Sequence, residues 1–151
     1  MQPVIRTATP ADAPAISQLI ITTLHKSNGQ DYAPEIIEQV QQHFSCEAIV
    51  QFLTQRQVYV ATVEGEVVAT ASLDRSTVRS VFVAPSHQEA GIGRLLMARL
   101  ESAASEAGIK QLRVPSSITA EGFYAGLGFV KVRDEFHGAE RTIVMEKTLG
   151  S

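Results

Sequence analysis

Cysteine, tryptophan and long apolar runs are scarce or missing in this sequence, and each absence excludes a class of protein. The 151-residue chain has one cysteine, Cys46, and no tryptophan. A single cysteine excludes an internal disulfide and a thiolate zinc cluster within one chain, and we expect Cys46 to be a small buried apolar residue. No window approaches about 18 uninterrupted apolar residues, so no membrane-spanning helix is expected.

The chain also lacks a large excess of positive or negative charge. The formal net charge is −3, from 13 basic and 16 acidic residues, and no cluster of lysines or arginines stands out, so nucleic acid is not an expected partner. The first eight residues lack the basic and then apolar pattern of a signal peptide, which favours a cytoplasmic location. The four histidines show no ligand-like spacing, so no metal site is expected.

The apolar content of 44% is typical of an ordinary globular protein, and the spacing of its apolar residues predicts one α/β (α+β) domain over residues 1–151. Alternation predicts strands at 4–8, 58–63, 67–73, 78–83, 112–114, 129–136 and 141–147. Helical spacing predicts helices at 10–24 with Thr9 as N-cap, 35–44, 47–55, 92–107 and 118–126.

The segment QEAGIGRLLM, residues 88–97, places two glycines directly before a helix. Each glycine costs about 1 kcal/mol of helix propensity relative to alanine, so the pair favours a compensating role. The first helical turn has unpaired N–H groups at the positive end of the helix dipole, and glycine lets an anion approach them closely. The alternative is a softened helix start without a ligand. A P-loop is excluded because no Lys-Ser/Thr pair follows, and a dinucleotide fingerprint because Leu96 takes the third glycine position.

Two patterns in the second half of the chain together resemble one family. The first is Val78-x-x-Val81-Phe82-Val83-x-Pro85 with Gln88-x-x-Gly91-x-Gly93, which is similar to the acetyl-CoA-binding segment of the GCN5-related N-acetyltransferases (GNAT). The second, Ser117-x-x-Ala120-x-x-Phe123-Tyr124-x-x-x-Gly128-Phe129, resembles the second signature of that family, at its usual separation. The resemblance extends to the opening residues 5–12 and to the element order. Glu89 and Thr119 depart from the pattern, because the family favours a basic or small polar residue and an asparagine there.

The resemblance implies a mixed central sheet that splays between its fourth and fifth strands, with helices on both faces and the pantetheine of acetyl-CoA entering the gap. Backbone groups of Val81 and Val83 would bind the pantetheine, and amides from Gln88 to Arg94 would hold the pyrophosphate. The cofactor-binding residues it implies are Val81, Phe82, Val83, Gln88, Glu89, Ala90, Gly91, Ile92, Gly93, Arg94, Ser117 and Phe123.

The resemblance also implies an enzyme that moves the acetyl group of acetyl-CoA directly to a primary amine of a small molecule or peptide. Tyr124 would protonate the leaving thiolate, because a phenol is still protonated at neutral pH; a plain packing role is the alternative. Asp74, His25 and His137 are candidate bases for the amine proton, with Asp74 at the end of a central strand, and each could equally be a solvated loop residue. A non-catalytic acyl-CoA-binding or regulatory module on the same fold is the alternative function.

The acceptor pocket is expected between residues 25–33 and the loop around His137. Candidate substrate-binding residues are His25, Asp31, Tyr32 and His137. Asp31 could attract an ammonium group or simply be a helix-start carboxylate. A homodimer is compatible with the family, and the sequence does not identify the amine.

Overall fold

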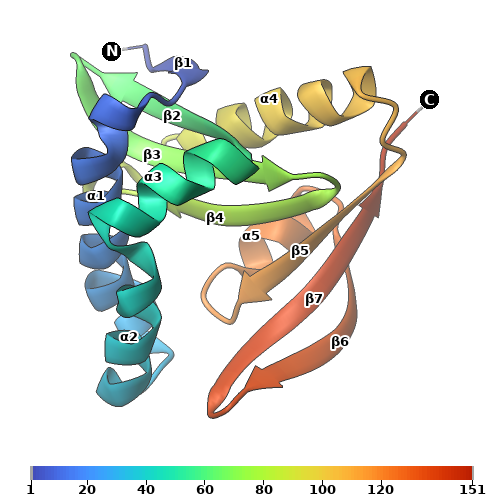
Figure 1. Cartoon of the computed structure of the whole chain (residues 1–151). Helices are drawn as coiled ribbons and strands as arrows, with labels where there is room; N and C mark the ends of the chain where they lie inside the picture. The colour runs from blue at the N-terminus through green and yellow to red at the C-terminus, as the bar shows by residue number, and fades with distance from the viewer. Residues whose placement is uncertain (1, 151) are drawn as a thin grey trace.

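The computed structural model describes residues 2–150, which form a seven-stranded sheet with helices on both faces (Figure 1). The strands are β1 Val4–Thr7, β2 Gln57–Val63, β3 Glu66–Asp74, β4 Thr77–Val83, β5 Gln111–Ser117, β6 Val130–His137 and β7 Glu140–Thr148. The helices are α1 Ala13–Lys26, α2 Pro34–Gln41, α3 Cys46–Gln55, α4 Ile92–Glu106 and α5 Glu121–Gly126. This architecture confirms the predicted fold class.

The sheet is nearly divided in two between β4 and β5. The strand order is β1-β2-β3-β4-β5-β7-β6, and only the β4–β5 pair is parallel. That pair is limited to one position, Thr77 with Arg113, whereas β5 pairs with β7 over its full length. Beyond the single pairing the two strands diverge, as Figure 1 shows. The predicted splay is therefore confirmed.

Pro115 helps to explain why the parallel pairing stops. The N–H of Arg113 donates to Ser76 O on the β4 side at 3.0 Å. Because successive N–H groups in a strand point to opposite sides, the nitrogen of Pro115 also faces β4, and proline has no hydrogen to donate. The prediction that the strand ends at Val114 was wrong for this reason: Pro115 interrupts the β4 side only, and pairing with β7 continues to Ser117.

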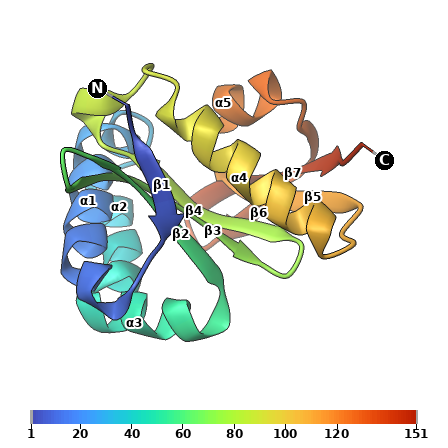
Figure 2. The same cartoon turned by 90° about the horizontal axis from the view of Figure 1, so that it is seen from above.

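The two faces of the sheet bury separate apolar clusters. Helices α1, α2 and α3 cover one face, where Ile16, Ile20 and Val60 are almost fully buried. Helix α4 lies across the opposite face and buries Leu96 and Leu100, an arrangement seen from above in Figure 2. The cavity described below is lined by residues from both clusters.

The first helix begins with the predicted cap, although its first turn is a 3-10 turn, Pro10–Asp12. Asp12 accepts hydrogen bonds from the Thr9 N–H at 2.8 Å and from both terminal nitrogens of Arg6 at 2.8 and 2.9 Å. The bidentate Arg6 bond is the main reason that the pKa of Asp12 falls to about 2.

The burial of Cys46 and two helix boundaries differ from the predictions. Cys46 is exposed rather than buried, because it follows the N-cap Ser45 in the outer first turn of α3. Helix α1 continues through His25, which was expected in a loop, and α5 begins at Glu121 rather than Ile118. Among residues 2–150, no helix has the length and apolar content needed to cross a membrane.

Candidate active site

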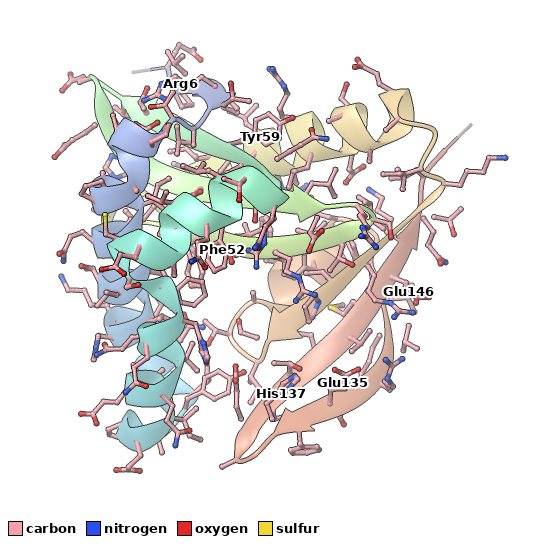
Figure 3. The ribbon with its side chains drawn as sticks, in the orientation of Figure 1. Arg6, Phe52, Tyr59, Glu135, His137 and Glu146 are labelled. Carbon is pink, nitrogen blue, oxygen red and sulfur yellow. The ribbon has the colours of Figure 1, made fainter. Side chains whose placement is uncertain are left out.

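A cavity of about 1050 Å³ lies where β4 and β5 part. It reaches from the loop after β4, past the diverging strands, to the inner faces of α1, α2 and α3 and the turn between β6 and β7. Figure 3 shows Phe52 on α3 and His137 at the end of β6, two lining residues that lie far apart on its wall. The cavity therefore extends from α3 to the β6–β7 turn.

The backbone of β4 is available on the side that faces β5. The N–H of Ala84 donates to Val68 O on β3 at 2.8 Å, so by alternation the N–H and C=O groups of Val83 and Val81 face the gap. The side chain of Gln88 occupies one of them, because its Nε2 donates to Val83 O at 3.0 Å. Within the described residues, the N–H of Val83 and both groups of Val81 therefore have no strand partner.

Strand β4 has a bulge at Ser80 and Val81, next to these free backbone groups. Arg79 pairs with Ser72 and Phe82 with Thr70, so Ser80 and Val81 together face one residue of β3. Ser80 has a φ of 55°, a left-handed conformation that a non-glycine residue adopts at a cost of about 1–3 kcal/mol. The bulge turns the next part of β4 away from β5 and widens the gap.

The loop before α4 presents a continuous run of unpaired N–H groups. Within residues 2–150, none of the backbone N–H groups from Gln88 to Arg94 donates to a protein acceptor, and the first bond of the helix runs from Leu95 to Gly91 O at 3.1 Å. Glu89 and Gly91 have φ values of 65° and 83°. Left-handed residues in such a loop form a nest of N–H groups, which binds anions at a helix N-terminus.

The two glycines of this loop have different roles. Gly91 supplies the left-handed conformation at the N-cap of α4, with open space around it. Gly93 has ordinary helical geometry, and a Cβ there would lie 3.0 Å from Cε1 of Phe123. Gly93 is therefore required for packing against the aromatic wall of the cavity.

Tyr124 lines the cavity although it is only 3% exposed. Its ring packs edge-on against Phe123 and Phe129, with centroids at 5.2 and 5.5 Å. Within residues 2–150 the phenol has no hydrogen-bond partner, yet no partnerless side-chain oxygen is fully enclosed, so the phenol oxygen is open to the cavity. Burial raises the pKa of Tyr124 above its ordinary value, which keeps the phenol protonated.

Most of the residues expected to bind the cofactor line the cavity. They are Val81, Phe82, Val83, Gln88, Glu89, Gly91, Gly93, Arg94, Ser117 and Phe123. The side chain of Ile92, the first residue of α4, is instead buried in the apolar core, and exposed Ala90 is outside the cavity lining. For these two residues only the backbone N–H is available to a ligand.

The expected acceptor and base residues are only partly brought together. Tyr32 and His137 line the cavity, whereas His25, Asp31 and Asp74 do not. His25 Nε2 lies 2.6 Å from Gln41 Oε1, and Asp31 accepts a hydrogen bond from Thr119 at 2.7 Å. Asp74 lies at the β3–β4 turn, 4.0 Å from Arg79, so the geometry separates it from Tyr124.

Tyr32 connects the helical layer to the second half of the sheet. Its hydroxyl donates to Arg141 O at 2.7 Å and accepts from the N–H of Ile118 at 2.8 Å. Half-burial is the main reason that the pKa of Tyr32 is raised. With both contacts made, Tyr32 shapes the cavity wall rather than offering a free hydroxyl to an acceptor.

Several lining residues have no signal in the sequence that would have identified them. They include Arg56, Arg79, Ser80, Phe44 and Phe52. Arg56 follows α3, where the sequence marks only the end of a helix, and Arg79 and Ser80 lie inside a strand. His43, which the sequence gave no reason to select, also lines the cavity. Only the folding of α3 over β4 brings these residues together.

Comparisons with known proteins agree with this geometry. The family model described as "Acetyltransferase (GNAT) domain" matches residues 28–149, and no curated protein is significantly similar. A GCN5-related N-acetyltransferase structure from Rhodopseudomonas palustris superimposes with a TM-score of 0.93 at 23% identity, covering 99% of this chain and 97% of that one. PaiA N-acetyltransferase from Thermoplasma acidophilum, in complex with coenzyme A, gives 0.82 at 17% identity, covering 98% and 99%.

A third structure, N-acetylglutamate synthase from Neisseria gonorrhoeae complexed with coenzyme A and N-acetyl-glutamate, gives a TM-score of 0.76 at 20% identity. The match covers all of this chain but 36% of that one. At these identities the structural matches show a shared fold.

Proposed function

Since the chain belongs to the GNAT acetyltransferase family, we propose that it transfers the acetyl group of acetyl-CoA directly to a primary amine of a small molecule or peptide. The observation that carries this proposal is the run of unpaired N–H groups from Gln88 to Arg94 beside a cavity that Tyr124 also lines. The N–H groups would hold a pyrophosphate, and Tyr124 would act at the thioester end of the same ligand.

The residues around the gap fit acetyl-CoA along its length. The N–H run and the side chain of Arg94 offer donors and positive charge to the pyrophosphate. The free backbone groups of Val81 and Val83 can bind the amides of the pantetheine as a neighbouring strand would. Phe123 supplies an apolar wall beside the arm. Acetyl-CoA, when bound, supplies the activated acetyl group as a thioester.

Tyr124 is the proposed general acid. When the amine nitrogen bonds to the acetyl carbon and the carbon–sulfur bond breaks, the thiolate needs a proton, and a neutral phenol within hydrogen-bond reach can give it. Burial favours the neutral form of Tyr124 before transfer. The phenolate then regains a proton from solvent in the cavity.

At neutral pH the acceptor is an ammonium ion, which must lose one proton before its nitrogen can attack, and His137 is the proposed acceptor of that proton. The nitrogen releases a second proton to solvent after its bond to the acetyl carbon forms. Of the three candidate bases, His137 alone lines the cavity. Its Nε2 lies 3.8 Å from Glu135 Oε1. Because His137 lies at the β6–β7 turn, far along the wall from Tyr124, the proton would travel through water.

The test is the variant Tyr124→Phe, assayed for acetyl-CoA binding by calorimetry and for thiol release from acetyl-CoA with a panel of amines. We expect the turnover number to fall by about 10²–10⁴-fold, the usual contribution of a general acid, with an unchanged dissociation constant for acetyl-CoA. Tyr59→Phe is the matched control, because Tyr59 is equally buried and its hydroxyl bonds only Gln57.

Two outcomes would contradict the proposal. Binding of acetyl-CoA without turnover of any amine would indicate the alternative function, a non-catalytic acyl-CoA-binding module. Absence of binding would refute the assignment of acetyl-CoA as the cofactor. Binding is also visible as a melting shift: a ligand at about 100 times its dissociation constant adds about 2.7 kcal/mol of stability, which raises the melting temperature of a domain of this size by about 5–10 °C.

A further inference from the structure

Arg56 carries a charge into the wall of the cavity without a carboxylate partner. Its side chain is half-buried, and within residues 2–150 no carboxylate oxygen lies within 4.0 Å of its guanidinium. It makes one weak hydrogen bond, from Nη1 to Ser80 Oγ at 3.3 Å, and its guanidinium lies 3.9 Å from the ring centroid of Phe52. Most of its five N–H donors are therefore free to bind another group.

A second guanidinium, that of Arg79, lies beside Arg56 on the same wall. Burial, and then the charge of Arg79, lower the pKa of Arg56, and Asp74 partly offsets this. Asp74 is 4.0 Å from Arg79 Nε, so two positive charges and one negative charge leave one net positive charge. Two neighbouring cations on a half-buried wall repel each other unless an anion lies between them.

This charge is separate from the loop that faces the pyrophosphate. Arg79 precedes Val83 by four residues of β4, at most about 13 Å of strand because of the bulge at Ser80, and the loop begins only beyond Val83. The guanidinium pair is on the face covered by α3, together with Phe44, Phe52 and Phe82. It therefore belongs to the half of the cavity that the acceptor would occupy.

We propose that Arg56 and Arg79 bind a carboxylate of the acceptor, so that the substrate is an amine that also carries a carboxylate group, such as an amino acid. This inference rests on the proposed acetyl transfer and identifies its substrate class. One net positive charge matches a monoanion better than a phosphate dianion, and the planar fork of arginine matches a carboxylate. The three phenylalanines would contact the apolar part of the acceptor.

The experiment compares L-amino acids with the corresponding L-amino acid amides, which differ only in the carboxylate. Turnover is measured as thiol release from acetyl-CoA, and binding as the melting-temperature shift in the presence of coenzyme A. In the unmodified protein we expect kcat/KM to favour the acids. In Arg56→Gln the ratio of kcat/KM between acid and amide should fall about 10–100-fold, the usual effect of losing a charge-assisted bidentate contact.

Arg79→Gln is the second variant, since its side chain is 43% exposed and its replacement perturbs folding little; it should lower the same ratio by a smaller factor. Arg133→Gln, an equally exposed arginine on β6 outside the cavity, is the charge-matched control and should leave the ratio unchanged. Arg56→Lys retains the charge without the fork and should restore only part of the preference.

Each result decides the inference. Equal kcat/KM for amides and acids, or a preference for aminophosphonic acids, would refute the carboxylate assignment while leaving acetyl transfer intact. If no amine is turned over, the proposed function fails, and the melting shift still decides the anion site: Arg56-dependent binding of the acids supports it, and equal shifts with acids and amides overturn it.

Discussion

The contact between Gly93 and Phe123 can be tested with a single methyl group. In Gly93→Ala the new Cβ would lie 3.0 Å from Cε1 and 3.1 Å from Cζ of Phe123, so the ring must move by a few tenths of an ångström. Overpacking of this kind costs about 1–3 kcal/mol, and alanine regains up to about 1 kcal/mol of helix propensity. The net loss in the free energy of unfolding should be about 1 kcal/mol.

A loss of similar size is expected in ligand binding, because the ring of Phe123 is half-buried and can yield toward the cavity. A loss of about 1 kcal/mol in binding free energy corresponds to about a fivefold weaker affinity for acetyl-CoA. Urea denaturation measures the first quantity and titration calorimetry the second.

Two controls separate the clash from general effects. Gly122→Ala adds a methyl group to α5 with no atom within 4 Å of it, and it should leave stability unchanged or raise it. Phe123→Leu removes the ring atoms that the methyl group meets, so Gly93→Ala should cost little in that background. If Gly93→Ala destabilises both backgrounds equally, the packing explanation is refuted.

Two further predictions concern hydrogen bonds that stabilise the fold. Because the folded pKa of Asp12 lies below its unfolded value, its interactions stabilise the fold above about pH 4 and lose that effect toward about pH 2. Asp12→Asn should therefore cost about 1 kcal/mol at pH 7, since Arg6 is partly exposed, and almost nothing near pH 2 in urea denaturation; a pH-independent difference would contradict this. Tyr32→Phe leaves Ile118 N–H and Arg141 O without their partner and should lower stability by about 1–3 kcal/mol in the same assay, more than the control Tyr59→Phe; an equal loss would contradict the bridging role.

The sequence was sufficient to predict the fold class, and it selected most of the residues that line the loop side of the cavity. Gly91, Gly93 and Tyr124 lie in local patterns whose spacing carries the information, because a nest of N–H groups forms from consecutive residues. Strand positions followed from alternation, and the splay followed from the family resemblance.

The residues on the α3 side of the cavity could not be predicted in the same way. Arg56 and Phe52 reach β4 only through the packing of α3, a tertiary contact with no local signal. The predicted roles of His25 and Asp31 rested on their being loop residues near a pocket, and hydrogen bonds to Gln41 and Thr119 occupy them instead. The strand predicted at residues 112–114 is too short, because the sequence alone does not show that pairing with β7 continues past Pro115.

The parted sheet has a consequence for self-association. A sheet ordinarily has two edges, but here the inner sides of β4 and β5 add two more, each with backbone groups that could pair with a strand from another molecule. Pro115 has no N–H to donate from the β5 edge, which disfavours pairing with another strand there. On the β4 edge, the side chain of Gln88 already donates to the carbonyl of Val83. A ligand seated in the gap would protect the remaining groups, so saturating the protein with coenzyme A should suppress aggregation during concentration and storage.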